Sequence, residues 1–412
     1  MKKRVVITGM GVVSPLGSTK EEFWDNLVEG KSGIAPMTSL DLSPYTCKLG
    51  GEVRGLSVET HLGKKGLKYL NKGTRFLGSA AKMALDDANL SPEDGSLADQ
   101  MGMVIGSSLG NFSETTDYFF EIIRNNPSEL SPMCSYDVAL NSSINYVSVT
   151  FKIKGPVRTL SAGFTSSTDA IGDACRMIKR GMAKVMVAGG VEQISIDLYL
   201  IFYLRGLLSG LDGTSEVCAP FDRERNGFVM AEGSQVIVLE ELQHALDRGA
   251  RIYAEVKGFG NTFAGGKKYS MEEKVRRVEK AMHYALEDAG LTKENIDCIN
   301  AGANGCKTQD YIEFMAIQSL YGENAVHIPI SAIKSNVGES YGTAGAAQII
   351  SAVMSINTGT IPHIINHKEQ DQENNLNLVL EKPLKKEINH AAVHNMDYDG
   401  NNSCLIVSTF NK

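Results

Sequence analysis

The chain repeats itself, and this repeat limits its fold more than any other feature. The segment KMALDDANLSPE at residues 82–93 is echoed by HYALEDAGLTKE at residues 283–294. Both read as amphipathic helices that end at Asn or Gly and precede a new Ser or Thr cap. Three more pairs keep the same order: residues 5–11 with 254–260, 103–108 with 298–303, and 160–167 with 330–337. We therefore expect an α/β protein of two βαβ-rich halves, 1–250 and 251–412, with mostly parallel sheets on a shared helical core.

Each half opens with a strand that closes on Gly-x-Gly, at residues 9–11 and 258–260. A dinucleotide-binding fingerprint would need a third glycine at position 14, which is Ser14, and no Gly-Lys-Ser/Thr motif is present. The eight histidines are scattered singly, without the spacing of metal ligands. We predict that the glycines serve tight turns of the repeated unit, and we expect no metal and no cofactor.

Charge and composition exclude several classes of protein. The net charge of -7 argues against binding to nucleic acid or to an anionic membrane surface. The opening residues read as a first strand rather than a signal peptide, and no apolar run approaches the roughly 18 residues of a membrane span. Seven cysteines without a CxxC pair fit free thiols in a reducing compartment. We expect a cytoplasmic protein that contacts neither nucleic acid nor membrane.

Residues 158–172 read as a strand, a tight turn of small residues and a helix, with Phe164 at the turn. Unpaired N–H groups at a helix start stabilise a thiolate or alkoxide, and this is the design of a nucleophile elbow. Phenylalanine carries no nucleophile. The pattern therefore predicts an elbow whose central position does not attack a substrate, or else an ordinary connection around a core aromatic residue.

Three stretches carry a resemblance to a known family: residues 6–17 (VITGMGVVSPLG), 185–190 (VMVAGG) and 219–233 (APFDRERNGFVMAEG). Across essentially its whole length, the chain resembles the β-ketoacyl synthases of fatty-acid and polyketide synthesis. The resemblance implies a thiolase-like fold with a layered α-β-α-β-α core. It also implies an elbow cysteine that holds the acyl chain, and two histidines that assist decarboxylation and stabilise negative charge.

The positions that match these catalytic groups carry other residues. Phe164 stands at the cysteine position, and Gly302 and Glu339 stand at the two histidine positions. The glycine-rich loop that helps to form the oxyanion hole is DYDGNN at residues 397–402, while Lys334, Asp310 and Glu313 match the frame. A Glu339 carboxylate would repel an enolate. We therefore expect no catalytic residue, vestigial positions at Phe164, Gly302, Glu339 and Lys334, and a chain that is not by itself an enzyme.

Within the family, this pattern resembles the chain-length factor, the ketosynthase-like subunit of type II polyketide synthases. The resemblance implies a heterodimer with an active ketosynthase, an acyl carrier protein as a partner, and a growing polyketide chain in a tunnel at the interface. Many chain-length factors have glutamine at the elbow, where this chain has phenylalanine. The tunnel and interface positions expected from the family are Leu109, Phe112, Thr116, Tyr118, Phe119, Met133 and Cys134. The aromatic stripe at helical spacing fits plain core packing as well as it fits a tunnel wall.

A basic run stands out on this acidic chain: Lys64, Lys65, Lys68 and Lys72. Its family counterpart is a surface where carrier protein docks, and the alternative is a solvated helix face. Two other functions stay open. One is an acyl transferase or hydrolase that uses Ser161, Ser166 or Cys306 as nucleophile. The other is a homodimeric acyl-binding scaffold.

Overall fold

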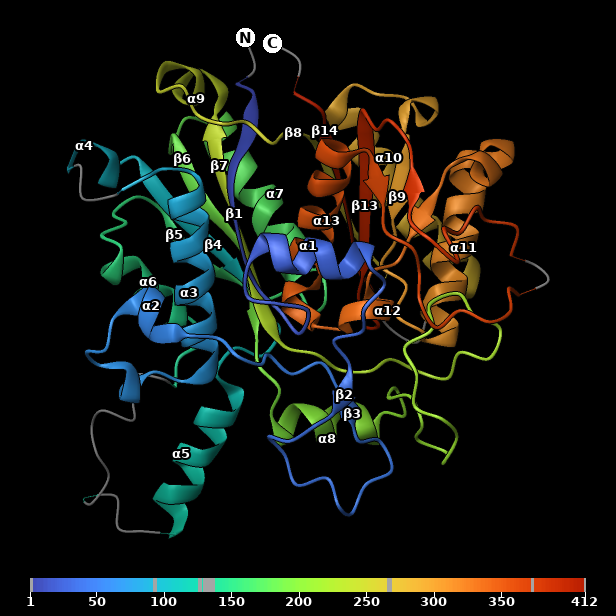
Figure 1. Cartoon of the computed structure of the whole chain (residues 1–412), viewed down its shortest axis with the longest axis horizontal. Coiled ribbons are helices and arrows are strands. Elements are labelled where there is room, and N and C mark those ends of the chain that lie inside the picture. The colour runs from blue at the N-terminus through green and yellow to red at the C-terminus, as the bar shows by residue number, and fades with distance from the viewer. Residues whose placement is uncertain are drawn as a thin grey trace.

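The computed structural model describes residues 3–91, 95–124, 128, 138–264, 269–371 and 374–410. One sheet of ten strands runs through it, in the order β10-β9-β13-β14-β8-β1-β7-β6-β4-β5 (Figure 1). Its strands are β1 (Val5–Val13), β4 (Met101–Gly106), β5 (Val157–Leu160), β6 (Val185–Glu192), β7 (Gly233–Glu241), β8 (Ala254–Phe263), β9 (Cys298–Asn300), β10 (Ile330–Ser331), β13 (His390–Met396) and β14 (Asn401–Ser408). Two short hairpins add β2 (Ala35–Pro36) with β3 (Leu49–Gly50), and β11 (Thr360–Ile361) with β12 (Leu384–Lys385).

The helices lie around and between these strands (Figure 1). They are α1 (Lys20–Val28), α2 (Val58–Leu62), α3 (Lys72–Asp87), α4 (Gly95–Ala98), α5 (Phe112–Arg124), α6 (Ser142–Thr150), α7 (Ser166–Lys179), α8 (Ile196–Leu204), α9 (Leu242–Asp247), α10 (Met271–Ala289), α11 (Lys307–Tyr321), α12 (Lys334–Val337) and α13 (Ala344–Thr358). Short 3₁₀ turns are η1 (Leu67–Tyr69), η4 (Lys293–Asn295), η5 (Gly322–His327) and η6 (Tyr341–Thr343). Within the described residues, every helix is too short or too polar to cross a membrane.

The sheet confirms the repeat. Read outward from its centre, β1-β7-β6-β4-β5 on one side matches β8-β14-β13-β9-β10 on the other. The directions match too: the first two pairings on each side are antiparallel and the last two are parallel. On each side four of the five strands run in the same direction, and only β7 or β14 runs the opposite way, so each half is mostly parallel, as expected, with one antiparallel strand. A short antiparallel contact between β1 and β8 joins the two sides. The division into domains at residue 250 stays a prediction.

The Gly-x-Gly pairs have a different cause from the one expected. Gly9 and Gly11 lie inside β1, and Gly258 and Gly260 lie inside β8, so none of the four serves a turn. A Cβ atom at any of them would overlap a backbone carbonyl of α3 or of α10. The helix therefore packs directly on the strand backbone in both halves, and only glycine permits that approach.

The buried helices α7 and α13 pack against each other in the middle of the molecule (Figure 1). The loops that follow β5, β9, β10 and β13 lead to the site described below, as the ends of strands do in other α/β proteins. The fold thus brings together segments near residues 164, 302, 334 and 397, which are far apart in the sequence.

Candidate functional site

The segment around Phe164 is a strand-turn-helix elbow, as predicted. β5 ends at Leu160 and α7 starts at Ser166, with Gly163 in the turn at a left-handed φ of +62°. A side chain at Gly163 would overlap the Asp397 carboxylate, so glycine is needed there both for the turn and for the contact. Ser166 Oγ accepts from the Ala162 N–H at 2.9 Å and donates to the Gly163 carbonyl at 2.6 Å.

Phe164 fills the space behind the elbow. Its side chain is buried, and four other rings surround it at centroid distances of 5.3–5.9 Å: Phe202, Phe228, Tyr341 and Tyr398. Phe202 and Tyr341 also stack on each other at 4.8 Å. Each such pair adds about 0.5–1.5 kcal/mol beyond the burial of its area. We call these five residues the aromatic cluster; they leave the elbow without an open pocket of its own.

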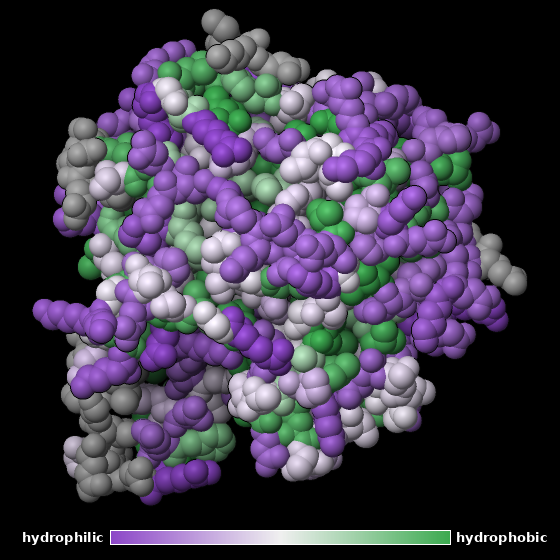
Figure 2. Space-filling view, in the orientation of Figure 1, coloured by the Kyte–Doolittle hydropathy of each residue, from purple (hydrophilic) through white to green (hydrophobic). Residues whose placement is uncertain are grey.

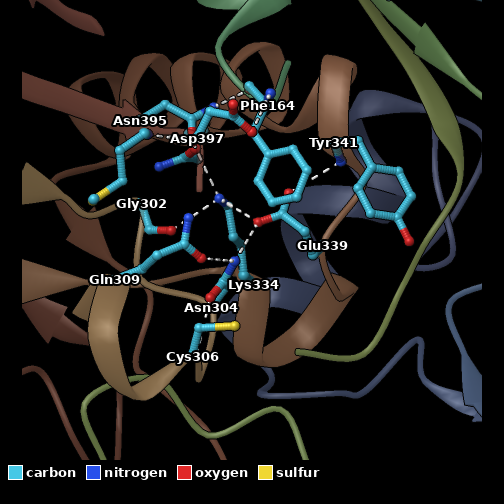
Figure 3. A network of polar contacts seen from close by, with 12 residues as sticks. Phe164, Gly302, Asn304, Cys306, Gln309, Lys334, Glu339, Tyr341, Asn395 and Asp397 are labelled. Carbon is cyan, nitrogen blue, oxygen red and sulfur yellow. Dashed lines mark hydrogen bonds and ion pairs between the residues drawn. The ribbon is translucent and has the colours of Figure 1, made fainter. Parts of the chain in front are cut away.

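Two of the four positions predicted as vestigial, Lys334 and Glu339, form a buried ion pair (Figure 3). Lys334 Nζ lies 2.8 Å from Glu339 Oε2, and it also donates to the Gly302 carbonyl at 2.9 Å. Asn304 Nδ2 donates to the same carboxylate oxygen at 2.8 Å, and the Tyr341 N–H donates to the other oxygen at 3.0 Å. Both charges are fully satisfied, so the glutamate is a partner of the lysine rather than a free carboxylate.

A second buried acid–base pair adjoins the first, and sequence reasoning missed it. His394 Nδ1 lies 2.6 Å from Glu313 Oε1, which also accepts from the Gly302 N–H at 2.8 Å. The Gly302 peptide therefore touches both pairs, one through its N–H and one through its carbonyl. The available signal was a histidine inside an apolar strand, since His394 lies two residues before the end of β13.

Asp397 lies where the family has a glycine-rich loop, and it faces the elbow. Its Oδ1 is 3.5 Å from the Phe164 N–H, and its Oδ2 accepts from the Asp399 N–H at 3.1 Å. Burial raises the pKa of this carboxyl group from 3.8 to about 7. The elbow N–H thus faces a side-chain carboxyl group of the same chain, which sequence reasoning did not predict.

The raised pKa of Asp397 predicts how the free energy of unfolding changes with pH. Between about pH 4 and 7 the unfolded chain loses this proton while the folded chain keeps it, so this group lowers the free energy of unfolding as the pH rises. Asp397→Asn should remove the contribution of this group to the fall in the free energy of unfolding. That contribution is up to about 4 kcal/mol for a pKa raised by three units. Urea unfolding at pH 5 and pH 8 measures it. The free energy of unfolding of the variant, relative to that of the wild type, should be higher at pH 8 than at pH 5. The same difference at both pH values would contradict the raised pKa of Asp397.

A cavity of about 470 Å³ opens next to the elbow. Its wall includes Leu207, Cys306, Gln309, Asp397 and Tyr398. Neither Phe164 nor the Lys334–Glu339 pair lines it. The Tyr398 ring stands between the cavity and Phe164, and Arg205 lies over that ring at 4.8 Å. A molecule in this cavity would meet Cys306 and Gln309 rather than residue 164.

Most of the residues predicted for a tunnel lie on α5, so the helix expected from their spacing is confirmed. Phe112 and Phe119 are 43% and 55% exposed, so they do not belong to a core within this chain. Thr116 and Tyr118 are half-buried, and Leu109 packs beside the aromatic cluster just before the helix. Met133 and Cys134 lie outside the described residues.

The basic run is not one helix face. Lys64 and Lys65 are exposed in the loop after α2, Lys68 is on η1, and Lys72 starts α3. Lys72 forms an ion pair with the buried Glu232, at a distance of 2.7 Å. Three cations therefore remain near the surface, with Lys64 3.7 Å from Glu59 and Lys68 over the Tyr69 ring.

The duplicated sheet, the central helix pair and the elbow define a thiolase-like protein with a ketosynthase-type site. Residues 2–245 match the N-terminal domain of β-ketoacyl synthases and residues 253–368 match the C-terminal domain. The chain belongs to the β-ketoacyl synthase family.

Similar proteins include a synthase and a ketosynthase/chain length factor. The 3-oxoacyl-(acyl-carrier-protein) synthase 2 of Synechocystis sp. is 32% identical over 98% of this chain and 97% of its own. The ishigamide ketosynthase/chain length factor superposes with a TM-score of 0.91 at 28% identity, over all of both chains. AntDE:AntF, a type II PKS acyl-carrier protein in complex with its ketosynthase bound to the hexaketide, gives 0.89 at 27%, again over all of both chains.

These relatives correct one expectation. We expected a chain that is not itself an enzyme, and this is wrong: a relative that spans nearly its whole length is named as a synthase, which is an enzyme. The replacements at Phe164, Gly302 and Glu339 describe how this site is built. They do not by themselves establish a loss of activity.

Proposed function

We propose that this chain is the chain-length subunit of a type II ketosynthase pair. In this function it binds an active ketosynthase side by side and contributes one wall of the tunnel that holds the growing polyketide chain. The similarity to the ishigamide ketosynthase/chain length factor supports this proposal. The filled elbow supports it too, because the aromatic cluster leaves no room behind Phe164 for a growing chain.

One observation carries the proposal: a set of exposed apolar side chains on α5 and α8. On α5, Phe119, Phe120 and Ile123 are 55%, 50% and 77% exposed, and on α8 Leu204 is 81% exposed. Ser113 Oγ of α5 donates to Asp197 of α8 at 2.7 Å, which holds the two helices together. Figure 2 shows apolar side chains at the lower part of the molecule, where Figure 1 places α5 and α8. We call the exposed apolar residues of these helices the pairing surface.

The free edge of β5 is a second feature that suits pairing with another chain. β5 ends the ten-stranded sheet and pairs only with β4 among the described strands. An edge strand with unpaired N–H and carbonyl groups binds another strand readily. Exposed aromatic and aliphatic residues of this kind mark an interaction site rather than an ordinary surface.

The experiment is co-expression with a ketosynthase that carries the cysteine and both histidines, preferably one encoded beside this chain. We expect the two chains to co-purify one to one, with a native mass of the heterodimer and a buried area on the order of 2,000–5,000 Å². A homodimer that ignores the ketosynthase would favour the acyl-binding scaffold instead.

We also propose that carrier protein docks near Lys64, Lys65 and Lys68. Reversal of all three to glutamate should weaken carrier binding to the pair by about tenfold or more at low salt, with a smaller effect at high salt. Surface plasmon resonance at two ionic strengths measures this. Lys82→Glu, a change on the exposed face of α3, is the matched control. Equal binding by the triple variant and the control would place docking on the partner subunit.

A further inference from the structure

One buried amide, that of Gln193, joins three elements that lie far apart in the sequence. Gln193 directly follows β6 and is 9% exposed. Its Nε2 donates to Glu114 Oε1 at 2.7 Å, in the first turn of α5. Its Oε1 accepts from the Gly73 N–H at 2.8 Å, in the first turn of α3, where helix N–H groups lack a partner within the helix. Both polar ends of the side chain are thus used, as a buried amide requires.

The neighbours of Gln193 hold the same helix. Glu192 accepts from the Ser108 N–H at 2.8 Å, in the loop that leads into α5. On the other side of Gln193, Asp197 of α8 accepts from Ser113 Oγ of α5 at 2.7 Å. The segment between β6 and α8 therefore fixes where α5 begins and in which direction the helix runs.

The direction of α5 matters because the helix is long and carries residues expected at the tunnel. Figure 1 shows α5 extending from the body of the molecule at the lower left. Its 13 residues span roughly 20 Å, so a tilt of about 10° at the first turn would move its far end by roughly 3 Å. Phe112 and Phe119 lie on this helix and would move with it. A change in the contact between Gln193 and Glu114 would therefore change the space beside both rings.

We propose that Gln193 is a positioning residue for the tunnel, and that its hydrogen bond to Glu114 helps to fix the length at which the product stops. This inference rests on the proposed function and names a contact that sets α5 within it. Hydrogen bonds to a carboxylate are stronger than those between neutral groups, and shielding from water strengthens them further. The contact therefore favours one orientation of α5. Gln193 acts through the helix and need not touch the polyketide chain.

Gln193→Glu tests the contact with almost no change in shape. At pH 8 it places two carboxylates face to face, so the first turn of α5 should be pushed away from β6. We expect the amide hydrogens of α5 in the single chain to exchange with deuterium about tenfold faster, as for the loss of a hydrogen bond to a charged group. The swapped pair, Gln193→Glu with Glu114→Gln, restores a donor and an acceptor, so exchange should return to within about twofold of the wild type.

Gln243→Glu is the matched control, because Gln243 Nε2 also donates to a carboxylate, that of Asp247, on α9. It should leave the exchange of α5 unchanged. Glu114→Leu removes the acceptor alone and should speed the exchange of α5 as Gln193→Glu does, so it serves as the second variant if Gln193→Glu does not fold.

Product length is the readout that a merely structural role would not move. In the reconstituted ketosynthase pair, mass spectrometry of the acyl-carrier species should show the share of the main product falling by about twofold or more in Gln193→Glu, in favour of other lengths. The swapped pair should recover the wild-type lengths. A role in stability alone would lower the yield and leave the lengths unchanged.

Three results would overturn the proposal: unchanged exchange of α5 in Gln193→Glu and Glu114→Leu, no recovery in the swapped pair, or unchanged product lengths from a Gln193→Glu chain that still pairs with the ketosynthase. The last result overturns only the role of Gln193. If the wild-type chain forms no pair with a ketosynthase, the proposed function fails, and the role of Gln193 in product length fails with it.

Discussion

Lys334→Met is expected to lower the free energy of unfolding by about 3–5 kcal/mol, because it leaves the Glu339 carboxylate charged and unpaired in the interior. The lysine also donates to the Gly302 carbonyl and to Asn395 Oδ1, so its loss leaves two more buried acceptors without this donor. Urea unfolding followed by circular dichroism measures the difference.

The double variant Lys334→Met with Glu339→Gln separates charge from packing. It removes both charges, so it should recover most of the lost stability, whereas a double variant no more stable than the single one would show that the ion pair is not the cause. Lys82→Met is the matched control, since Lys82 pairs with Asp86 on an exposed helix face and should cost below about 0.5 kcal/mol. If Lys334→Met does not fold, the comparison of Glu339→Gln with the double variant gives the same information.

The second large effect concerns the pairing surface. Ile123→Asp together with Leu204→Asp should abolish co-purification with the ketosynthase, a loss of affinity of about 100-fold or more, because each change buries a carboxylate at the centre of an apolar interface. Both side chains are more than three-quarters exposed in the single chain, so the folded monomer should keep its thermal unfolding midpoint. Native mass spectrometry of the co-expressed chains measures the pairing.

Leu246→Asp is the control for this variant, because Leu246 is 43% exposed on α9, which lies at the opposite end of the molecule from α5 (Figure 1). It should pair as the wild type does. Normal pairing by the double aspartate variant would contradict the assignment of the surface.

The sequence predicted the frame of this protein well, for a physical reason. Duplicated segments must occupy equivalent places, and β1 with β8 and β4 with β9 do so in the sheet. The elbow was also predictable, since Gly163 and the small residues around it are a local signal for a tight turn before a helix. The glycines of β1 were misread because their role depends on α3, about 70 residues further along the chain.

The chemistry of the site was less predictable, because it arises from contacts between distant segments. Lys334 and Glu339 are close in the sequence, but their pairing depends on the turn at Gly338 that ends α12. The contact of His394 with Glu313 joins a strand and a helix 81 residues apart. The Asp397 carboxyl group lies at the elbow only because β13 ends beside α7. No local sequence pattern indicates such contacts.

The central claim is that this chain helps to set product length from within a ketosynthase pair. The most direct measurement is mass spectrometry of the acyl-carrier species made by the reconstituted pair with Phe112→Ala or Phe119→Ala, with Leu246→Ala as the control. We predict products longer by one or more acetate units for the phenylalanine variants and an unchanged length for the control. An unchanged product distribution in all three variants, from a pair that still assembles, would contradict the claim.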